Sequence, residues 1–331
     1  MRRVWQLLFV VVMMLGASAC QSVSAGSTPT PLPTTTIALL NSIIQPDAGA
    51  QPVTSILNSA QKTIRMEMYL LTDREIIDAL KAARGRGVDV RVILEAQPTG
   101  SGLGNRPAIN DLQVANVSVK ASNPAYRLTH EKAIIVDERV ALIATFNQTR
   151  SSFTANREYG VVDANLDDVA EIVKVFDADW QRVTPTVSNP NLVWSPVNAR
   201  QRLGTLIDGA NQTLDIETEE LQDRAVEDRL IAAAQRGVTV RVVMSPVPSG
   251  NDANAVGLGR ITRGGVKLRL VKTPYIHGTL IVVDNARAFV GSQNISTASL
   301  DFNRELGILL VDASVIQVLS ETFAHDWNIG K

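Results

Sequence analysis

The chain has 331 residues, of which 45% are hydrophobic and 20% are charged, and its formal net charge is −1. This is an ordinary globular composition, long enough for one large core or two fused smaller ones. It shows no global basic excess of the kind that signals nucleic-acid binding, and its single cysteine excludes an intramolecular disulfide and any Cys-rich metal site.

Residues 1–20 have the features of an export signal. Two arginines are followed by the apolar run Val4–Leu15, which is too short for a comfortable membrane span, and small residues precede Cys20. The segment resembles a bacterial lipoprotein signal, in which the cysteine becomes the lipidated N-terminus, although Ala17 stands where such signals usually have Leu. Lipidation of Cys20 is the favoured prediction, and plain secretion or an uncleaved anchor are the alternatives.

Residues 21–40 begin with a stretch rich in Ser, Thr and Pro that carries few large apolar groups. Such a stretch cannot bury enough surface to offset the entropy lost on ordering, so we expect a tether. At about 3 Å per residue it would hold a domain on the order of 50 Å from a membrane. The expected location is therefore the outer side of the cytoplasmic membrane or the cell surface, with the membrane surface as a partner.

The remainder of the chain repeats itself. The segment Ile64–Gly100 matches Leu214–Gly250 at an offset of 150 residues, and a second pair of matching segments follows at an offset of 147. We therefore predict two similar lobes, residues 41–185 and 186–331.

Each lobe has the same predicted elements. In the first lobe, Ile64–Leu71 has a strand pattern, a helical face follows and ends near Gly85, and Val88–Leu94 is a second strand. A strand, a helix and a strand this close predict a parallel pair with a crossover helix. Ala133–Ala144 predicts a hairpin, and Leu166–Trp180 predicts a closing helix. The predicted fold is α/β, with two mixed sheets flanked by helices and packed about a pseudo-twofold axis.

Two of the three histidines begin the second pair of repeated segments, and the third, His325, lies outside the repeat. In both segments an Asp lies seven residues after the His, an Asn 17 residues after it and a Glu 28 residues after it. The matched residues are His130, Asp137, Asn147 and Glu158 in the first segment and His277, Asp284, Asn294 and Glu305 in the second. Scarce residues do not fall into register by chance, so we interpret the pattern as a duplicated site.

These residue types suit chemistry at phosphorus. A pair of histidines supplies a nucleophile and an acid or base near neutral pH, and a carboxylate behind each imidazole would fix its tautomer. Lys132 can direct an ammonium group at an anion, and the asparagines add neutral donors. The set requires no metal and no cofactor.

The two segments resemble the phospholipase D superfamily, whose motif H-x-K-x4-D-x6-G-S-x-N occurs twice and is followed by a glutamate. The resemblance extends to its phosphatidyltransferases of the cardiolipin synthase type. It implies two α/β lobes with the active site between them, a covalent phosphohistidine, and the second histidine as general acid. By position, the implied catalytic residues are His130, Lys132, Asn147, Glu158, His277, Asn294 and Glu305. Asp137 and Asp284 are interpreted as turn and orienting residues, and Thr145, Ser292 and Thr279 as substrate-binding residues.

The chain departs from the motif at two places. Thr279 stands where the second motif has Lys, and Ala144-Thr145 replaces the first Gly-Ser. Thr145 keeps a hydroxyl group, whereas Thr279 removes a full positive charge from the expected phosphate clamp. Loss of one preorganised donor typically costs about 10²–10³ in rate, unless Lys272 or Arg127 reaches into the site and replaces it.

We therefore expect a phospholipase D-type phosphodiesterase that hydrolyses or transfers phosphatidyl groups of phospholipids. One alternative is an exported nuclease of the same superfamily. Removal of residues 1–20 leaves 30 basic and 33 acidic side chains, a net charge of −3, which argues against backbone binding to nucleic acid. A second alternative, motivated by Thr279, is a degenerate module that binds phosphodiesters without turnover.

Overall fold

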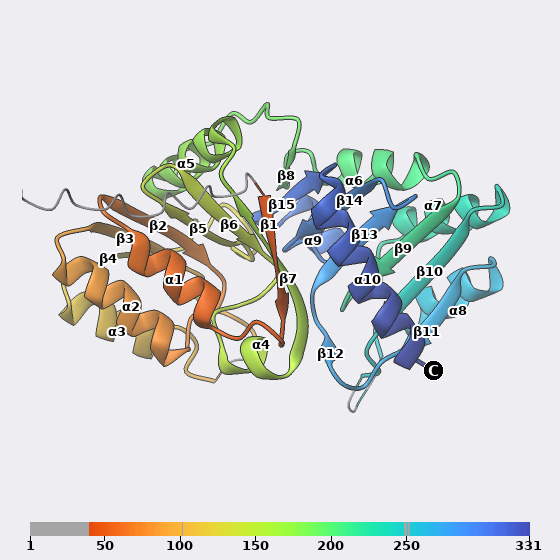
Figure 1. Cartoon of the computed structure of the whole chain (residues 1–331), viewed down its shortest axis with the longest axis horizontal. Coiled ribbons are helices and arrows are strands. Elements are labelled where there is room, and N and C mark those ends of the chain that lie inside the picture. Colours follow the sequence, from red (N-terminus) through yellow and green to blue (C-terminus); the bar gives the residue numbers. More distant parts are fainter. Residues whose placement is uncertain (1–39, 101, 248–249, 251) are drawn as a thin grey trace, which may run out of the picture. The chain divides into compact units, whose positions relative to one another are not determined.

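The computed structural model describes residues 40–100, 102–247, 250 and 252–331. All of them belong to one compact unit, Ile37–Lys331. The predicted signal segment, with Cys20, and all but the last residue of the predicted tether lie outside the described residues. The described chain forms two α/β lobes, each with a mixed sheet flanked by helices, as the repeats predict (Figure 1).

The sheet of the first lobe has the order β1-β7-β6-β5-β2-β3-β4. Its strands are β1 (Leu40–Gln45), β2 (Thr63–Met68), β3 (Asp89–Leu94), β4 (Ser118–Ala121), β5 (Lys132–Val136), β6 (Val140–Ala144) and β7 (Asn156–Asp163). Strands β2, β3 and β4 run parallel to one another, and the other neighbouring pairs are antiparallel. The predicted parallel pair and the predicted β5–β6 hairpin are confirmed.

The helices of the first lobe cover both faces of this sheet. They are α1 (Gln51–Ser59), α2 (Arg74–Gly85), α3 (Arg106–Val114), α4 (Arg150–Thr154) and α5 (Leu166–Gln181). Helix α2 begins where the Asp73 side chain accepts hydrogen bonds from two backbone N–H groups of its first turn. Its apolar residues recur on one face and are buried. The chain then leaves the helix at Gly87, whose φ of 92° favours a residue without a Cβ.

The second lobe repeats this plan, with the sheet order β11-β10-β9-β13-β14-β15-β8. Its strands are β8 (Leu192–Ser195), β9 (Thr213–Glu217), β10 (Thr239–Met244), β11 (Lys267–Leu270), β13 (Thr279–Val283), β14 (Arg287–Gly291) and β15 (Glu305–Leu310). Its helices are α6 (Ala199–Asp208), α7 (Arg224–Gln235), α8 (Ala255–Arg263), α9 (Thr297–Asp301) and α10 (Ala313–Ile329). One short strand of its sequence, β12 (Tyr275–Ile276), pairs instead with β7 of the first lobe.

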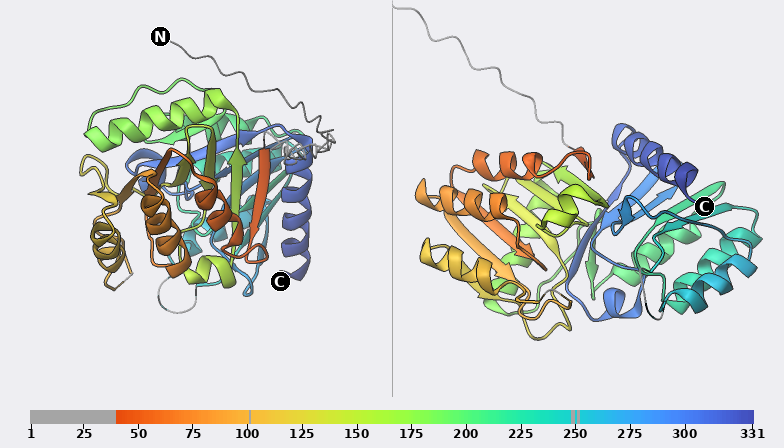
Figure 2. Two further views of the ribbon diagram at one scale, coloured as in Figure 1. Left: turned by 60° about the vertical axis from the view of Figure 1, so that its left-hand side comes forward. Right: turned by 90° about the horizontal axis from the view of Figure 1, so that it is seen from below.

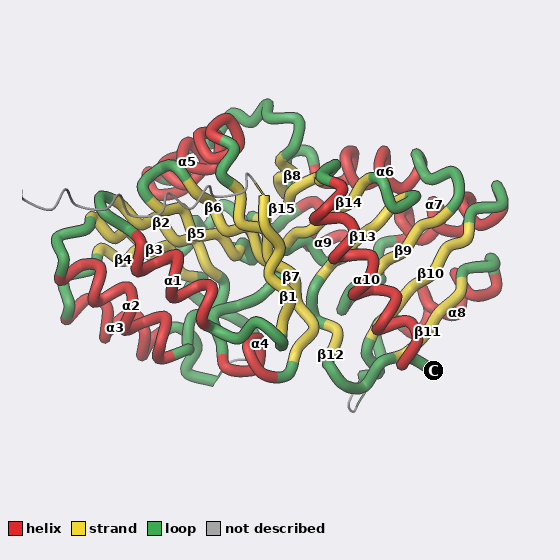
Figure 3. The backbone as a smooth tube through the Cα atoms, viewed as in Figure 1, coloured by secondary structure: helices red, strands yellow, loops and turns green. Residues whose placement is uncertain are grey.

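The buried apolar residues form three layers. One lies between the first sheet and helices α1 to α3, and another lies between the second sheet and helices α6 to α8. The central layer joins the two sheets and includes Val169 and Phe176 of α5 and Val315 and Phe323 of α10. Figures 2 and 3 show the sheets between the outer helices of the two lobes. Because the central layer draws on both lobes, burial of its apolar surface stabilises their association. Within the described residues, no helix is both long and apolar enough to span a membrane.

Candidate active site

The segment that precedes each histidine lies against the other lobe. Strand β12, just before His277, pairs with β7, and the backbone N–H of His277 donates to the carbonyl of Arg157 at 3.3 Å. The equivalent contact in the other direction joins the N–H of His130 to the carbonyl of Arg304 at 2.9 Å. Each of these arginines immediately precedes a predicted site glutamate. These two contacts between the lobes therefore bring each histidine next to the glutamate of the opposite lobe.

Two crossed histidine–glutamate pairs result. Nδ1 of His130 lies 2.9 Å from Oε2 of Glu305, and Nδ1 of His277 lies 2.8 Å from Oε1 of Glu158. Both glutamates are fully buried. Because a carboxylate engages Nδ1 in each pair, it favours the tautomer in which Nδ1 carries a proton, and Nε2 is the nitrogen available for chemistry.

Short hydrogen bonds hold each glutamate in place. Thr145 donates its hydroxyl to Glu158 at 2.7 Å. Ser299 donates its hydroxyl to Glu305, and the amide of Asn303 donates to the same oxygen at 3.0 Å. Buried carboxylates that accept such bonds keep a fixed orientation toward their histidine.

The charge state of the second pair follows from its surroundings. Burial alone lowers the pKa of His277, but the charges of Glu158 and Glu219 raise it to about 9, against a smaller opposing effect of Lys132. Burial likewise raises the pKa of Glu158, but the His277 charge and hydrogen bond bring it below its usual value. At neutral pH this pair is therefore an imidazolium and a carboxylate.

Lys132 is buried beneath the first histidine. Its Nζ donates to the backbone carbonyl of His130 at 2.7 Å and lies 5.1 Å from the centre of the Tyr69 ring. Burial lowers the pKa of Lys132 to about 8, although several carboxylates, Glu305 foremost, act in the opposite direction. The lysine thus places a positive charge beside the backbone of His130, and this charge lowers the pKa of His277.

A cavity of about 790 Å³ opens in front of the histidines. Four of the predicted catalytic residues line it: His130, Asn147, His277 and Asn294. Its wall also includes side chains that the sequence analysis did not assign to the site: Tyr69, Glu219, Glu220 and Tyr275. Arg127 lines it as well, whereas Lys272 is exposed and is not among the described residues of the wall.

The three residues predicted to bind substrate lie elsewhere. In the described structure none of Thr145, Ser292 and Thr279 lines the cavity, and each is at most 3% exposed. The Ser292 hydroxyl bonds to the backbone of Leu306, and the Thr279 hydroxyl lies 3.3 Å from that of Thr218. Direct substrate binding by these three residues therefore stays a prediction, and in this structure they lie behind the wall of the cavity. They sit at or next to strand ends that direct the side chains into the protein, where they support the site.

The two motif aspartates lie at the opposite end of the hairpin from the histidines. Asp137 accepts hydrogen bonds from three successive backbone N–H groups, those of residues 61 to 63, and Asp284 does the same for residues 211 to 213. Both have a positive φ, of 52° and 54°. The structure therefore places them in turns, where they fix the start of β2 and of β9.

A second crossed pattern ties the lobes together. Arg157 lies 2.5 Å and 3.2 Å from the carboxylate oxygens of Asp326 on α10, and Arg304 lies 2.8 Å and 3.0 Å from those of Asp179 on α5. All four side chains are buried. Because each arginine directly precedes a site glutamate, these bidentate pairs anchor the strands that present Glu158 and Glu305.

A signal for the anchoring arginines was present in the sequence. The tripeptide Asn-Arg-Glu occurs at the end of both histidine segments, and an aspartate recurs near the end of both halves, at Asp179 and Asp326. For the acidic side chains of the cavity, the signal was a difference in residue type at equivalent positions of the two halves. At the offset of 150 residues, Tyr69 is replaced by Glu219.

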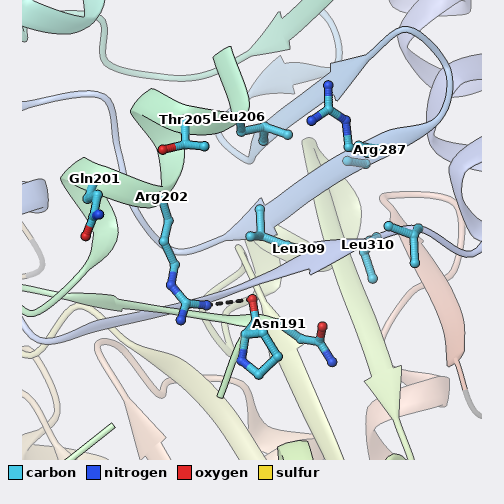
Figure 4. A pocket seen from close by; sticks show the side chains of 11 residues that line it. Asn191, Gln201, Arg202, Thr205, Leu206, Arg287, Leu309 and Leu310 are labelled. Atoms are coloured by element: carbon cyan, nitrogen blue, oxygen red, sulfur yellow. Dashed lines mark hydrogen bonds between the residues drawn. The ribbon is translucent and has the colours of Figure 1, made fainter. Parts of the chain in front are cut away.

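A second cavity of about 490 Å³ lies on the second lobe (Figure 4). Its described wall contains Leu206, Leu309 and Leu310 together with Arg202 and Arg287, and no histidine or carboxylate. Both arginines donate to backbone carbonyl groups, Arg202 to that of Pro190 and Arg287 to that of Gly209. It therefore offers no nucleophile and no acid–base pair. Elsewhere in the described residues, no group of three or more His, Cys, Asp or Glu side chains is placed to hold a metal ion.

Comparison with known proteins identifies related sequences. Residues 53–180 and 203–327 match the family described as "Cardiolipin synthase, PLD-like domain". Among curated proteins, the chain is 22% identical over 328 residues to a cardiolipin synthase of Clostridium perfringens, covering 82% of this chain and 67% of the relative. It is 25% identical over 317 residues to cardiolipin synthase B of Salmonella typhi, covering 79% of this chain and 74% of the relative. The chain thus spans about two thirds to three quarters of these relatives.

Solved structures share the fold. Phosphatidylserine synthase from Haemophilus influenzae Rd KW20 matches with a TM-score of 0.70 and 13% identity, over 88% of this chain and 87% of that chain. Polyphosphate kinase from Porphyromonas gingivalis matches with a TM-score of 0.69 and 17% identity, over 86% of this chain and 46% of that chain. At these identities the likeness concerns the architecture of two fused lobes.

Proposed function

The chain belongs to the phospholipase D-like family described as "Cardiolipin synthase, PLD-like domain", and we propose that it is an enzyme that transfers or hydrolyses phosphatidyl groups of phospholipids. The observation that carries the proposal is the pair of crossed histidine–glutamate contacts in one cavity. In a single site this arrangement supplies a nucleophile and an acid, each oriented by its own carboxylate.

In the first step, Nε2 of His130 attacks the phosphorus atom of the phosphodiester. A nitrogen–phosphorus bond forms, the bond from phosphorus to the head-group oxygen breaks, and His277 gives its Nε2 proton to that oxygen. The assignment of the two roles rests on the pKa of His277, which the nearby carboxylates raise to about 9, so that it carries the proton at neutral pH. Glu305 stabilises the charge that develops on His130.

In the second step, an acceptor hydroxyl enters on the side of His277, which is now neutral. His277 removes the hydroxyl proton, the new oxygen–phosphorus bond forms, and the nitrogen–phosphorus bond to His130 breaks. Water as acceptor gives hydrolysis, and an alcohol gives phosphatidyl transfer. Arg127 lines the cavity and offers positive charge for the phosphoryl oxygens, and the buried Lys132 adds positive charge from behind the wall.

Support for phosphatidyl transfer comes from the relatives named as cardiolipin synthases, which are 22% and 25% identical to this chain.

We also propose that the protein is exported and anchored through Cys20, because residues 1–20 combine a basic start, a short apolar run and small residues before that cysteine. An anchor of this kind would keep the cavity close to its lipid.

The test is a substrate panel with the purified protein. Labelled phosphatidylglycerol, phosphatidylethanolamine, phosphatidylcholine and plasmid DNA are each incubated with and without glycerol as acceptor. We expect release or exchange of a lipid head group and no cleavage of DNA. Cleavage of DNA alone would instead favour the nuclease alternative.

A covalent intermediate gives a separate test of mechanism. Rapid quenching at alkaline pH, where phosphohistidine survives, followed by mass spectrometry should find the phosphatidyl group on the peptide that contains His130.

The loss of the second motif lysine at Thr279 favours one alternative, a module that binds phosphodiesters without turnover. Saturable lipid binding without any product would support that alternative.

A further inference from the structure

The two halves of the cavity differ in charge. In the first lobe, Tyr69 and Leu70 line the wall beside the histidine, and at the equivalent positions of the second lobe stand Glu219 and Glu220. The first lobe also contributes Arg127 to the wall. The duplication has therefore produced a cavity that is basic on the side of the first lobe and acidic on the side of the second.

Glu219 is placed at the reacting nitrogen of the second histidine. Its Oε2 lies 3.5 Å from Nε2 of His277, and its Oε1 accepts a hydrogen bond from the Tyr275 hydroxyl at 3.0 Å. The Glu219 side chain is 31% exposed, so its carboxylate is accessible from the cavity. The tyrosine holds the carboxylate in position without neutralising its charge.

Two further residues of the wall, Glu220 and Asn147, carry oxygen acceptors. Burial raises the pKa of Glu220, and the nearby Glu219 raises it further, against the opposing effects of Ser296 and His130. Such a carboxylate gains from a positive charge in the cavity. Asn147 is 8% exposed, and its side-chain oxygen accepts no hydrogen bond from the described residues. A buried acceptor without a donor is costly, so a rotation of this side chain that brings the oxygen to a donating ligand in the cavity would be favourable.

The position of these acceptors matches one part of a phosphodiester. In the proposed reaction the head-group oxygen leaves at His277, and the accepting alcohol enters there. In an amino alcohol such as ethanolamine, the nitrogen lies within about 4 Å of that oxygen, because only three covalent bonds separate them. An ammonium group at that distance reaches the Glu219 carboxylate while the phosphate faces the basic side of the cavity.

We propose that Glu219 and Glu220 form a subsite for the positive charge of a zwitterionic phosphodiester, whose head group is an ammonium-bearing alcohol such as ethanolamine or choline. The inference rests on the proposed function, because it assumes that the head group lies at His277. The subsite discriminates against a neutral head group such as glycerol, which leaves both carboxylates in the cavity without a cation.

The first test measures binding, so that it does not depend on turnover. In the His130→Ala protein, isothermal titration calorimetry compares glycerophosphoethanolamine, glycerophosphocholine and glycerophosphoglycerol. We expect the two cationic head groups to bind about tenfold more tightly than the glycerol head group, an effect that needs both carboxylates because one partly exposed charge pair supplies at most about fivefold. Adding Glu219→Gln and Glu220→Gln should reduce the difference to less than about twofold.

A matched control keeps the interpretation specific. Glu321→Gln removes a carboxylate from an exposed position on α10 and should leave the preference unchanged. Equal binding of the three ligands, or a preference that survives the double substitution, would overturn the inference.

The second test uses kinetics, and it separates the inference from the function beneath it. Wild-type protein and the Glu219→Gln, Glu220→Gln protein are compared on phosphatidylethanolamine and phosphatidylglycerol in mixed vesicles, as a ratio of kcat/KM. The ratio cancels any general effect of Glu219 on His277, and we expect it to fall about tenfold. Turnover of bis-p-nitrophenyl phosphate with no lipid preference would refute the subsite but leave the enzyme assignment intact. Absence of turnover on every phosphodiester would refute the assignment, and the calorimetry would still decide the subsite.

Discussion

The imidazole of His130 lies 2.9 Å from the carboxylate of Glu305, the glutamate that follows the histidine of the other lobe. The reciprocal contact joins His277 to Glu158 at 2.8 Å. Each histidine therefore takes the carboxylate at its Nδ1 from the opposite repeat, and the site forms only when the two lobes pack together. A substitution that disturbs the packing of the two lobes is therefore expected to disturb both histidine–glutamate pairs.

Replacement of His130 by Ala should abolish turnover of bis-p-nitrophenyl phosphate, because the proposed scheme forms its covalent intermediate on this imidazole. The matched control is His325→Ala, since His325 is exposed on α10 and lies outside the repeated segments. We expect full activity for the control and loss of at least about 10³-fold for His130→Ala, measured as kcat. A variant that retains more than about a tenth of the wild-type rate would exclude the nucleophile role.

Much of the fold followed from the sequence, because the repeats, the parallel β2–β3 pair and the β5–β6 hairpin are local patterns. The crossing of the histidine pairs did not follow. The spacing between His130 and Glu158 is the same as that between His277 and Glu305, so spacing alone cannot say which glutamate serves which histidine. That choice is made by the long-range contact of β12 with β7.

The lining of the cavity was also hard to predict from the sequence. Thr145 and Ser292 occupy motif positions, but the strands direct their side chains to the buried face, behind the glutamates, where the cavity does not reach. Glu219 was not predicted, because the site was inferred from residues that are identical in the two halves, and Glu219 differs from its equivalent, Tyr69. A difference between repeats carries information about the substrate, whereas an identity carries information about the common chemistry.

The pH dependence of kcat/KM should show a fall on the alkaline side between about pH 8 and 9. This quantity reports the free enzyme, in which His277 must be protonated to act as the acid. Its pKa is raised to about 9, so the protonated form persists through neutral pH and is lost as the pH rises through that value. Lys132, with a pKa lowered to about 8, loses its charge over the same range.

The charged groups around His277 allow the alkaline fall to be assigned. Glu158 and Glu219 raise its pKa, and Lys132 lowers it. Glu158→Gln should therefore move the fall in kcat/KM to lower pH, because the imidazolium loses its main counter-charge. Glu305→Gln, which removes the partner of His130, should reduce the rate without that displacement. The crossed arrangement would be wrong if Glu305→Gln, and not Glu158→Gln, moved the alkaline fall.

The buried ion pair between Arg157 and Asp326 should be important for stability. Asp326→Asn leaves the buried Arg157 with only the exposed Asp47 as a counter-charge, and loss of a buried partner typically costs about 3–5 kcal/mol. The control is Asp78→Asn, which removes an exposed partner of Arg74 on α2 and should cost at most about 0.5 kcal/mol. Urea unfolding followed by circular dichroism measures both. Similar midpoints for the two variants would show that the pair does not hold the lobes together.

Chelating agents should not affect activity. The histidines of the cavity are already engaged by carboxylates, and the described residues contain no cluster of ligands placed to hold a metal ion. Activity on bis-p-nitrophenyl phosphate is measured before and after dialysis against EDTA, and we expect equal rates. Inhibition that a single added metal ion reverses would require a different mechanism from the phosphohistidine scheme.

Thr279→Lys restores the lysine that the second motif lacks, and from the sequence alone it should raise kcat by adding a cation to the phosphate clamp. The structure changes this expectation. In the first lobe Lys132 lies over the ring of Tyr69, and the position equivalent to Tyr69 in the second lobe is Glu219. A lysine at 279 would therefore meet a carboxylate, and the two charges would neutralise each other. We expect Thr279→Lys alone to change kcat on bis-p-nitrophenyl phosphate by less than about threefold.

The double variant Thr279→Lys, Glu219→Tyr reproduces the arrangement of the first lobe and leaves the new ammonium group free to face the phosphate. We expect its kcat to rise, by up to about 10²-fold if a preorganised donor is gained, and its preference for zwitterionic head groups to disappear. Thr279→Met controls for the added volume, because Thr279 is buried and any long side chain must find room there. If Thr279→Lys alone raised kcat as much as the double variant, Glu219 would not lie in the path of the lysine. The acidic side of the cavity would then have to act on His277 alone, without a role in choosing the head group.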